Sequence, residues 1–312
     1  MEKEVYLSVN NLYKFFGEKE VIHDLSFDIH SGEILGFLGP NGAGKSTTIK
    51  MIMGFLSVDH GSITILGKDH QKNYEAAMAE IGGIVENPEM YFNLSGRLNL
   101  EMYRRLHPNV PISRIDEVLK LLHLEKRANE KVKNYSLGMK QRICIAQALL
   151  HKPKVLILDE PTNGLDPSGI LELRDLLIDL SHEKGMAILI SSHQLSEIQK
   201  ICDRVIIINK GILIDNQSIN HLIKQNEKNL TSIKFVDQKT RRQAMELLDI
   251  NSEFKLTPYQ ETSLILAIEE KQIPEIIFRL SQAHLAILSI CPYQTNLEEV
   301  YISVTGGGTT IE

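Results

Sequence analysis

The central motif of this chain is the glycine-rich run Gly39-Pro40-Asn41-Gly42-Ala43-Gly44-Lys45-Ser46-Thr47. An apolar, strand-like segment, Ile34–Leu38, leads into the run, and a helical segment is expected to follow it. Glycines at this spacing let the backbone curl so that successive N–H groups point inward, and the first turn of a helix adds its own free N–H groups. The run therefore predicts a loop that wraps around phosphate groups.

Two side chains of this loop have separate roles in the predicted site. Lys45 is placed to reach the β- and γ-phosphates of ATP, and Ser46 is placed to ligate Mg²⁺. The run Gly39–Thr47 as a whole would line the nucleotide. The alternative is a glycine turn that merely joins a strand to a helix, but the strand–turn–helix context favours nucleotide binding.

The apolar run Val155–Glu160 ends in two carboxylates. Such a run is typical of a buried parallel strand, and open α/β sheets bind ligands at the carboxyl ends of their strands. We expect Asp159 to hold the Mg²⁺ shell and Glu160 to orient and deprotonate the attacking water. The alternative is a strand that ends in solvated acids, which the phosphate loop upstream disfavours.

A third apolar strand, Ala187–His193, ends in polar residues and a histidine. A lone histidine is more often structural, but this one ends a core strand at the same edge, so we expect His193 to contact the γ-phosphate. Lys45, Glu160 and His193 then form the predicted catalytic set. The turn Asn163–Asp166, just past Glu160, is either a plain turn or a contact between subunits.

A second glycine turn, Ser136-Leu137-Gly138-Met139-Lys140-Gln141-Arg142, opens the apolar stretch Ile143–Leu150. This turn also has the form of a triphosphate cradle. One ATP needs only one such cradle from one fold. The second cradle therefore predicts that two copies of the chain share two nucleotides.

Near the start of the chain, Tyr13–Gly17 is rich in aromatic residues. An aromatic side chain at that place can stack on adenine, as aromatic residues stack on bases in nucleic-acid complexes. Phe16 is our candidate, with Phe15 in the core. The alternative is that both side chains are core residues.

Residues 5–218 resemble the ATP-binding subunits of ABC transporters. The resemblance rests on the order of four features: the phosphate loop, the second glycine turn, the Asp-Glu strand and the histidine. The resemblance implies a P-loop NTPase core of the α/β class, with an antiparallel β subdomain and a helical subdomain. It implies ATP and Mg²⁺ as ligands, and a second nucleotide-binding subunit, expected to be an identical copy. Integral membrane permease subunits are the other implied partner.

The same resemblance assigns roles to individual residues. Ser136 and Gly138 would contact the γ-phosphate held by the partner subunit. Asp166 would lie in the D-loop and His193 in the H-loop, and Phe16 would be the A-loop aromatic residue.

Two departures from the family pattern concern the site. The family's second turn has two adjacent glycines followed by Gln, whereas this chain has Leu137, Gly138 and Met139. The family also places a glutamine close to Mg²⁺ where this chain has Glu86. An ionised glutamate only accepts hydrogen bonds, so Glu86 either strengthens Mg²⁺ ligation or is a solvated loop acid.

The segment Glu86–Ser95 is similar to ABC subunits that export or protect against peptide antibiotics of the bacitracin and lantibiotic kind. The expected function is therefore ATP hydrolysis that powers a membrane exporter for peptide antibiotics or other drugs. The alternative is a soluble ABC ATPase that works in translation or DNA repair, but such proteins usually carry two cassettes or a long coiled-coil insertion. A nucleotide-dependent switch would lack Glu160 or His193.

Composition favours a protein without a nucleic-acid partner and with no membrane span of its own. The 34 Lys and Arg residues against 40 acids give a net charge of −6, and no basic run stands out. Apolar runs are far shorter than the roughly 20 residues of a membrane helix, and the N-terminus lacks a signal peptide's apolar core. Three isolated cysteines fit a reducing compartment. We expect a cytoplasmic protein, peripheral on the inner face of the cell membrane through its permease.

The order of predicted elements divides the chain into regions. Residues 1–218 form the nucleotide-binding domain, with the helical subdomain at about 89–149. In that subdomain, apolar residues at helical spacing predict one helix around Ile115–Leu122, capped by Ser113. A polar linker is predicted at 219–229, and a flexible tail at 306–312.

Residues 230–305 are predicted to form a small α+β domain of the ferredoxin-like type, with the order β-α-β-β-α-β. Its predicted elements are Ser232–Val236, Thr240–Leu248, Phe254–Leu256, Ser263–Ile268, Pro274–Gln282 and Ala286–Ile290, followed by a closing helix over Asn296–Val304.

Overall fold

The computed structural model of the chain describes residues 3–85, 90–226, 230–248, 262–268, 270–293 and 296–305. These residues belong to two compact units. The first unit holds the chain up to Ile219 together with its end from Tyr301, and the second holds Asn220–Val300.

The core of the first unit is a six-stranded sheet in the order β10-β9-β3-β8-β7-β6. Its strands are β3 (Ile34–Leu38), β6 (Ile81–Ile84), β7 (Val155–Asp159), β8 (Ala187–Ser191), β9 (Arg204–Asn209) and β10 (Ile212–Ser218). The pairs from β6 to β9 are parallel, and β10 runs antiparallel to β9. All residues of β3 and β8 are buried, as expected for a parallel sheet covered on both faces. The predicted α/β core is confirmed.

Several helices directly follow or precede strands of this sheet along the chain. They are α1 (Lys45–Ile52), α2 (Tyr74–Met78), α6 (Pro167–Ile178) with its π-helical continuation η3 (Asp179–Glu183), and α7 (Leu195–Ile201). Helix α1 follows β3 directly through the glycine-rich loop, and α6 starts with a proline in its first turn. The loops that precede α1, α6 and α7 all leave carboxyl ends of parallel strands, where the site lies.

A second sheet has the order β2-β1-β4-β5 and pairs antiparallel throughout. Its strands are β1 (Val5–Phe16), β2 (Lys19–His30), β4 (His60–Ile65) and β5 (Lys68–Asp69). Strands β1 and β2 are each 12 residues long. Register shifts interrupt their pairing, and Asn11 and Asp24 have positive φ angles of 44° and 48°, so the alternation of buried and exposed residues breaks inside each strand.

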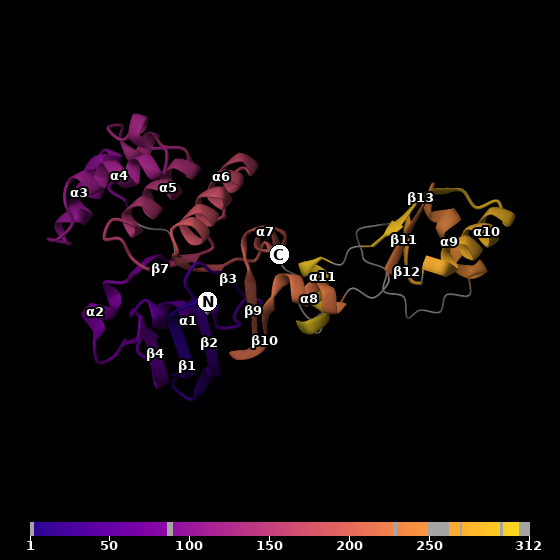
Figure 1. The fold of residues 1–312 in the computed structure, drawn as a ribbon, viewed down its shortest axis with the longest axis horizontal. Coiled ribbons are helices and arrows are strands. Elements are labelled where there is room, and N and C mark those ends of the chain that lie inside the picture. Colours follow the sequence, from indigo (N-terminus) through magenta and orange to yellow (C-terminus); the bar gives the residue numbers. More distant parts are fainter. Residues whose placement is uncertain are drawn as a thin grey trace. The chain divides into compact units, whose positions relative to one another are not determined.

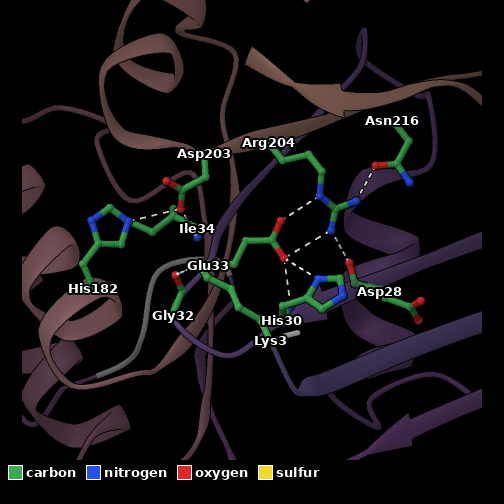
Figure 2. A network of polar contacts seen from close by, with 10 residues as sticks. All are labelled: Lys3, Asp28, His30, Gly32, Glu33, Ile34, His182, Asp203, Arg204 and Asn216. Carbon is green, nitrogen blue, oxygen red and sulfur yellow. Dashed lines mark hydrogen bonds and ion pairs between the residues drawn. The ribbon is translucent and has the colours of Figure 1, made fainter. Parts of the chain in front are cut away.

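A polar network fastens the start of β9 to the end of β2 and the start of β3 (Figure 2). The Arg204 guanidinium donates to both carboxylate oxygens of Glu33, at 2.7 and 3.2 Å, and to the carbonyl of Asp28. Glu33 also accepts from the backbone N–H of His30, at 2.8 Å. Because Glu33 is only 7% exposed, this carboxylate needs its cationic partner.

The helical subdomain contains α3 (Gly96–Arg105), α4 (Ser113–Leu121) and α5 (Leu137–Ala148), with the short turns η1 (Glu125–Arg127) and η2 (Val132–Asn134). Figure 1 shows α3, α4 and α5 grouped together. The predicted apolar face of α4 is confirmed, since Ile115, Val118 and Leu119 are buried. The predicted cap is wrong: the capping position belongs to Ile112, and Ser113 is the first helical residue.

Among the described residues, the second unit contains a three-stranded antiparallel sheet in the order β12-β11-β13. Its elements are β11 (Leu230–Phe235), α9 (Gln238–Leu247), β12 (Ser263–Ala267), η4 (Glu270–Gln272), α10 (Ile273–Gln282) and β13 (Ile287–Pro292). Ile233, Phe235, Ala244, Leu264 and Leu280 form its buried core. The predicted strand Phe254–Leu256 and the predicted tail 306–312 lie outside the described residues.

Two helices lie where the chain passes between the units, α8 (Ile219–Asn226) and α11 (Leu297–Thr305). The first part of the predicted linker 219–229 is thus helical, and the linker itself stays a prediction. Ile219 and Leu222 are buried, and their spacing of three residues gave a helical signal that the surrounding Asn, Gln and Lys residues masked.

Among the described residues, none of the helices has the length and apolar character that crossing a membrane requires. Two of the cysteines, Cys144 and Cys202, are buried, and Cys291 is exposed. Burial raises the pKa of the Cys144 thiol to about 12, so this side chain acts as a small apolar group.

Candidate functional site

The loop between β3 and α1 has a backbone that requires glycine at several positions. Gly42 and Gly44 have φ angles of 77° and 109°, in the region that L side chains rarely adopt. A Cβ atom on Gly44 would lie 2.4 Å from Cδ1 of Ile22, and one on Gly39 would lie 2.5 Å from the carbonyl oxygen of Ile208. The loop therefore presents bare backbone, as the prediction of a phosphate cradle demands.

The helix that follows this loop leaves its first N–H groups available. Gly44 occupies the capping position of α1, and no side chain among the described residues caps the helix there. Free N–H groups and the helix dipole together favour an anion. Thr48 Oγ1 donates to the Gly44 carbonyl at 3.0 Å, which helps to hold the start of the helix in place.

Lys45 is the cation of the loop. Its Nζ donates to the Gly39 carbonyl at 2.6 Å and lies 3.4 Å from the Pro40 carbonyl. Burial lowers the pKa of Lys45, and the nearby charges of Glu160 and Asp159 act in the opposite direction. The loop carbonyls thus bind the ammonium, and the charges of the acids at the end of β7 act on it; this is the place expected for the terminal phosphates of ATP.

The ends of β7 and β8 bring the predicted acids and the histidine together. Asp159 and Ser191 are partners in the parallel register of these strands, and the Ser191 hydroxyl donates to Asp159 Oδ1. Just beyond this pair, His193 Nδ1 lies 2.8 Å from Glu160 Oε2. The predicted proximity of Asp159, Glu160 and His193 at one sheet edge is confirmed.

Glu160 has an unusual backbone conformation, with a positive φ of 52°. Its N–H group donates to both the carbonyl oxygen and the hydroxyl oxygen of Ser191, each at 3.1 Å. Positive φ angles in non-glycine residues typically cost about 1 kcal/mol or more and persist where the surrounding structure enforces them. The chain therefore turns sharply after β7 and aims Glu160 at His193.

Two buried hydroxyl residues beside the acids have no role in the sequence-based prediction. Ser191 is fully buried and touches both acids. Thr162 is 3% exposed, and its Oγ1 has no hydrogen-bond partner among the described residues. The position of Ser191 opposite Asp159 follows from strand pairing, so only a prediction of the strand register would have found it.

The second glycine turn forms the start of α5. Ser136 caps this helix and accepts a hydrogen bond from the Met139 N–H at 3.3 Å. A Cβ atom on Gly164 would lie 2.7 Å from Cδ2 of Leu137, so the leucine that replaces a family glycine packs against the loop before α6. Among the described residues, the nearest atom to a Cβ on Gly138 would be Cδ2 of Leu165, at 3.8 Å.

Asp166 caps α6, where its Oδ1 accepts from the Gly169 N–H at 2.9 Å. The contacts of Ser136, Gly138 and Asp166 thus lie within α5, α6 and the loop that joins Glu160 to α6. Glu86, the predicted additional Mg²⁺ ligand, lies outside the described residues.

The strand hairpin that carries Phe16 lies beside the phosphate loop. Ile22 of β2 pairs with Lys14 of β1 and contacts Gly44. Phe16 is 51% exposed and Phe15 is 36% exposed. The interpretation of both as core residues is wrong, as is the placement of Phe15 in the core, because the end of the hairpin projects beyond the sheet core.

The class of protein follows from four features of this site: a cradle of bare backbone, a half-buried cation, a carboxylate–serine pair and a carboxylate–histidine pair. The arrangement can bind a nucleoside triphosphate, stabilise negative charge on its phosphates and activate water against the terminal one. The protein is a P-loop nucleotide hydrolase.

Comparisons with known proteins identify the family. The ABC transporter family model matches residues 22–163. The chain is 43% identical to the uncharacterized ABC transporter ATP-binding protein YhcH of Bacillus subtilis over 96% of each chain. It is 36% identical to the bacitracin transport ATP-binding protein BcrA of Enterococcus faecalis over 99% of each chain. A solved ATP-binding subunit of an ABC transporter matches with a TM-score of 0.64 and 30% identity, over 71% of this chain and 93% of that chain.

This chain belongs to the ABC transporter family, and its activity is ATP hydrolysis. The resemblance inferred from the order of its motifs is confirmed, including the similarity to a bacitracin transport subunit. The alternative of a soluble ATPase in translation or DNA repair is not favoured by these relatives.

Proposed function

We propose that this chain powers a membrane exporter that removes peptide antibiotics of the bacitracin kind, or other drugs, from the cell. The observation that carries the proposal is the similarity to BcrA over 99% of both chains. The intact Glu160–His193 pair supports an exporter driven by ATP turnover, because a protein that only senses nucleotide has no need of a base.

In this proposal the backbone of Gly39–Thr47 and the Lys45 ammonium bind the phosphates of ATP. Glu160 accepts a proton from the attacking water, and His193, which holds the Glu160 carboxylate at 2.8 Å, contacts the γ-phosphate. Positioned bases contribute about a hundred- to ten-thousand-fold in rate. The Phe16 ring stacks on the adenine.

The donor set also fits a magnesium ion. Ser46 offers a hydroxyl next to Lys45, and Asp159 offers a carboxylate that Ser191 orients. Oxygen ligands of this kind suit Mg²⁺, which would neutralise charge on the phosphates when bound. We propose Ser46 and Asp159 as its protein ligands, with Glu86 as a further candidate.

We further propose that two identical copies face each other, with Ser136, Gly138 and Asp166 of one copy closing over the ATP of the other. Open space beside Gly138 supports this role, since among the described residues the nearest atom to a Cβ there would be Leu165 Cδ2 at 3.8 Å, which leaves room for a partner's phosphate. Permease subunits form the second interface, so the chain would meet the inner face of the membrane only through them.

The second unit is proposed to be a ferredoxin-like domain. Its described sheet has the first predicted strand, β11, between β12 and β13, and both pairings are antiparallel. The split β-α-β arrangement of that fold also places its first strand between two later, antiparallel strands. Helices α9 and α10 occupy the predicted positions.

The test combines the chain, in a bacitracin-sensitive host, with a candidate permease, chosen as any multi-spanning membrane protein that a neighbouring gene encodes. The pair should raise bacitracin resistance, and Glu160→Gln should abolish the resistance while ATP binding persists. Glu183→Gln, a change at an exposed acid on η3, serves as the matched control and should keep the resistance. If Glu160→Gln protects as well as the wild type, hydrolysis does not drive export.

A further inference from the structure

The end of β1 contains a buried lysine close to the exposed Phe16 ring. Lys14 is 5% exposed. Its Nζ donates to the Ser57 carbonyl at 2.7 Å, to Asp59 Oδ1 at 2.8 Å and to Ser57 Oγ at 3.3 Å. An ammonium has three N–H donors, and here each has an acceptor. The charge is therefore fixed in position, because releasing it inside the protein would leave it unpaired.

The Asp59 carboxylate connects this charge to the backbone of the hairpin. Its second oxygen accepts from the Phe15 N–H at 2.7 Å. The pairing of β1 with β2 shifts register between Lys14 and Phe15, and such shifts redirect the side chains that follow. The segment Ser57–Asp59, just before β4, thus determines how the last residues of β1 leave the sheet.

Phe16 differs from Tyr13 and Phe15, its aromatic neighbours near the end of β1. The Lys14 ammonium lies 5.7 Å from the centroid of the Phe16 ring, within the range of a cation–π interaction. Tyr13 instead packs edge-on against His23 at 5.2 Å, and Phe15 packs edge-on against His60 at 6.3 Å. Since Phe16 is half exposed, one side of its ring meets a fixed cation and the rest is open.

We propose that Lys14, held by Ser57 and Asp59, is a positioning residue that fixes the Phe16 ring as a platform for the adenine of ATP. The ammonium occupies one face of the ring, and the base stacks on the other. This inference rests on the stacking role proposed for Phe16 above. It adds that recognition of the base depends on an ion pair between β1 and the segment that precedes β4.

A purely structural lysine would give a different result from a positioning lysine. If Lys14 only stabilised the fold, its loss would weaken all ligands of the site alike. If it orients Phe16, its loss weakens binding of the base and leaves binding of the phosphates intact. The ligand that separates these cases is inorganic tripolyphosphate, which has the phosphate chain of ATP and no base.

The experiment measures dissociation constants of ATP and of tripolyphosphate, both with Mg²⁺, for the full-length protein. Lys14→Met keeps the apolar stem and removes the charge. We expect this variant to raise the Kd for ATP about three- to tenfold, because it loses the cation–π contact and the Phe16 ring becomes less ordered. The Kd for tripolyphosphate should change less than about twofold. Phe16→Ala should show the same selectivity, and the double variant should be no weaker than Phe16→Ala alone.

Lys68→Met is the control, because it removes another lysine–carboxylate ion pair of the same sheet, the more exposed Lys68–Glu80 pair at 2.9 Å. It should leave the ratio of the two Kd values unchanged. If Lys14→Met does not fold, Asp59→Asn is measured instead, since it withdraws the charge that holds the ammonium, and the same selectivity is expected.

Equal loss of ATP and tripolyphosphate binding, or additive effects in the double variant, would overturn the positioning role of Lys14. A Phe16→Ala protein that binds ATP normally would overturn it as well, together with the stacking role of Phe16. Neither result touches the proposed exporter, which stands or falls with the Glu160→Gln experiment.

Discussion

Ser191 is the residue on which both acids of the site depend. Its hydroxyl donates to Asp159 Oδ1 and accepts from the Glu160 N–H, while its carbonyl accepts from the same N–H. These bonds help to hold Glu160 at its positive φ. The serine therefore sets the distance between the proposed metal ligand and the proposed base, although it need not touch ATP.

Ser191→Ala should lower the turnover number about ten- to hundredfold, with little change in ATP affinity. The reason is the loss of hydrogen bonds to charged and strained groups, worth about 1.5–3 kcal/mol, where 1.4 kcal/mol is a factor of ten. Steady-state phosphate release and equilibrium ATP binding measure the two quantities.

Ser192→Ala provides the control for this prediction. Ser192 is also buried, but its hydroxyl accepts from the Gln194 N–H and meets neither acid. Turnover of Ser192→Ala should stay within about threefold of the wild type after correction for stability. Equal losses in the two variants would show that packing at the end of β8, and not the bonds of Ser191, supports catalysis.

At the scale of elements, α5 begins with a serine that has two proposed roles. Ser136 caps the helix in its own chain, and it is proposed to contact the partner's ATP. Ser95 caps α3 with nearly the same geometry, accepting from the Leu98 N–H at 3.2 Å. The two serines allow the capping role to be separated from the ligand role.

Ser136→Ala and Ser95→Ala should each reduce the free energy of unfolding by about 1 kcal/mol, the usual cost of a lost cap. Only Ser136→Ala should also reduce ATP turnover, by about tenfold or more. Denaturant unfolding and phosphate release give the comparison. Turnover is compared after correction for the change in stability. If it then falls in both variants, or in neither, Ser136 does not contact the partner's nucleotide.

The network around Arg204 makes the joint between β2, β3 and β9 sensitive to acid. Burial acts to raise the pKa of Glu33, but hydrogen bonds from Arg204 and from the His30 N–H outweigh it and hold the pKa below its usual value. The pKa of such a carboxyl is lower in the folded protein than in the unfolded chain, where it is about 4.3. The carboxylate therefore stabilises the fold at pH values above about 4.3, and this stabilisation is lost as the pH falls through the pKa of the folded protein.

We therefore expect Glu33→Gln to lower the melting temperature at pH 7, because it leaves the Arg204 charge without its counter-ion; such losses reach about 3–5 kcal/mol. The difference from the wild type should hold down to about pH 5.5 and shrink below about pH 4.5. Glu117→Gln, a change in an exposed pair with Arg114, should have little effect. A difference independent of pH would mean that Glu33 contributes through packing alone.

The sequence predicted those parts of the fold and site that depend on local spacing. The phosphate loop, the acids that end β7 and the histidine after β8 each follow an apolar run, and parallel pairing brings them to one edge. Contacts between Lys14 and Asp59, or Glu33 and Arg204, leave no such signal, because the partners are far apart in the chain and either could be an ordinary surface charge. The sequence did not predict helix α8, because polar residues surround its buried apolar residues Ile219 and Leu222.

At the scale of the whole molecule, the proposed mechanism requires a dimer that ATP assembles and hydrolysis separates. Within one copy, the contacts of Ser136, Gly138 and Asp166 lie around α5 and α6. These are the residues that we propose to meet a partner's nucleotide. Blocking hydrolysis should preserve the assembled state, and blocking the approach of the partner should prevent it.

Gly138 permits a test that spares the fold of the single copy. Among the described residues, the nearest atom to a Cβ at this position would be Leu165 Cδ2 at 3.8 Å, which is ordinary van der Waals contact. Glu160→Gln should run as a dimer with ATP and as a monomer without it, in size-exclusion chromatography with light scattering. The double variant Glu160→Gln with Gly138→Val should remain monomeric with ATP, at an ATP affinity within about threefold of Glu160→Gln. A dimer in the double variant would show that the partner's phosphate does not approach Gly138, and a monomer in Glu160→Gln would remove the shared site altogether.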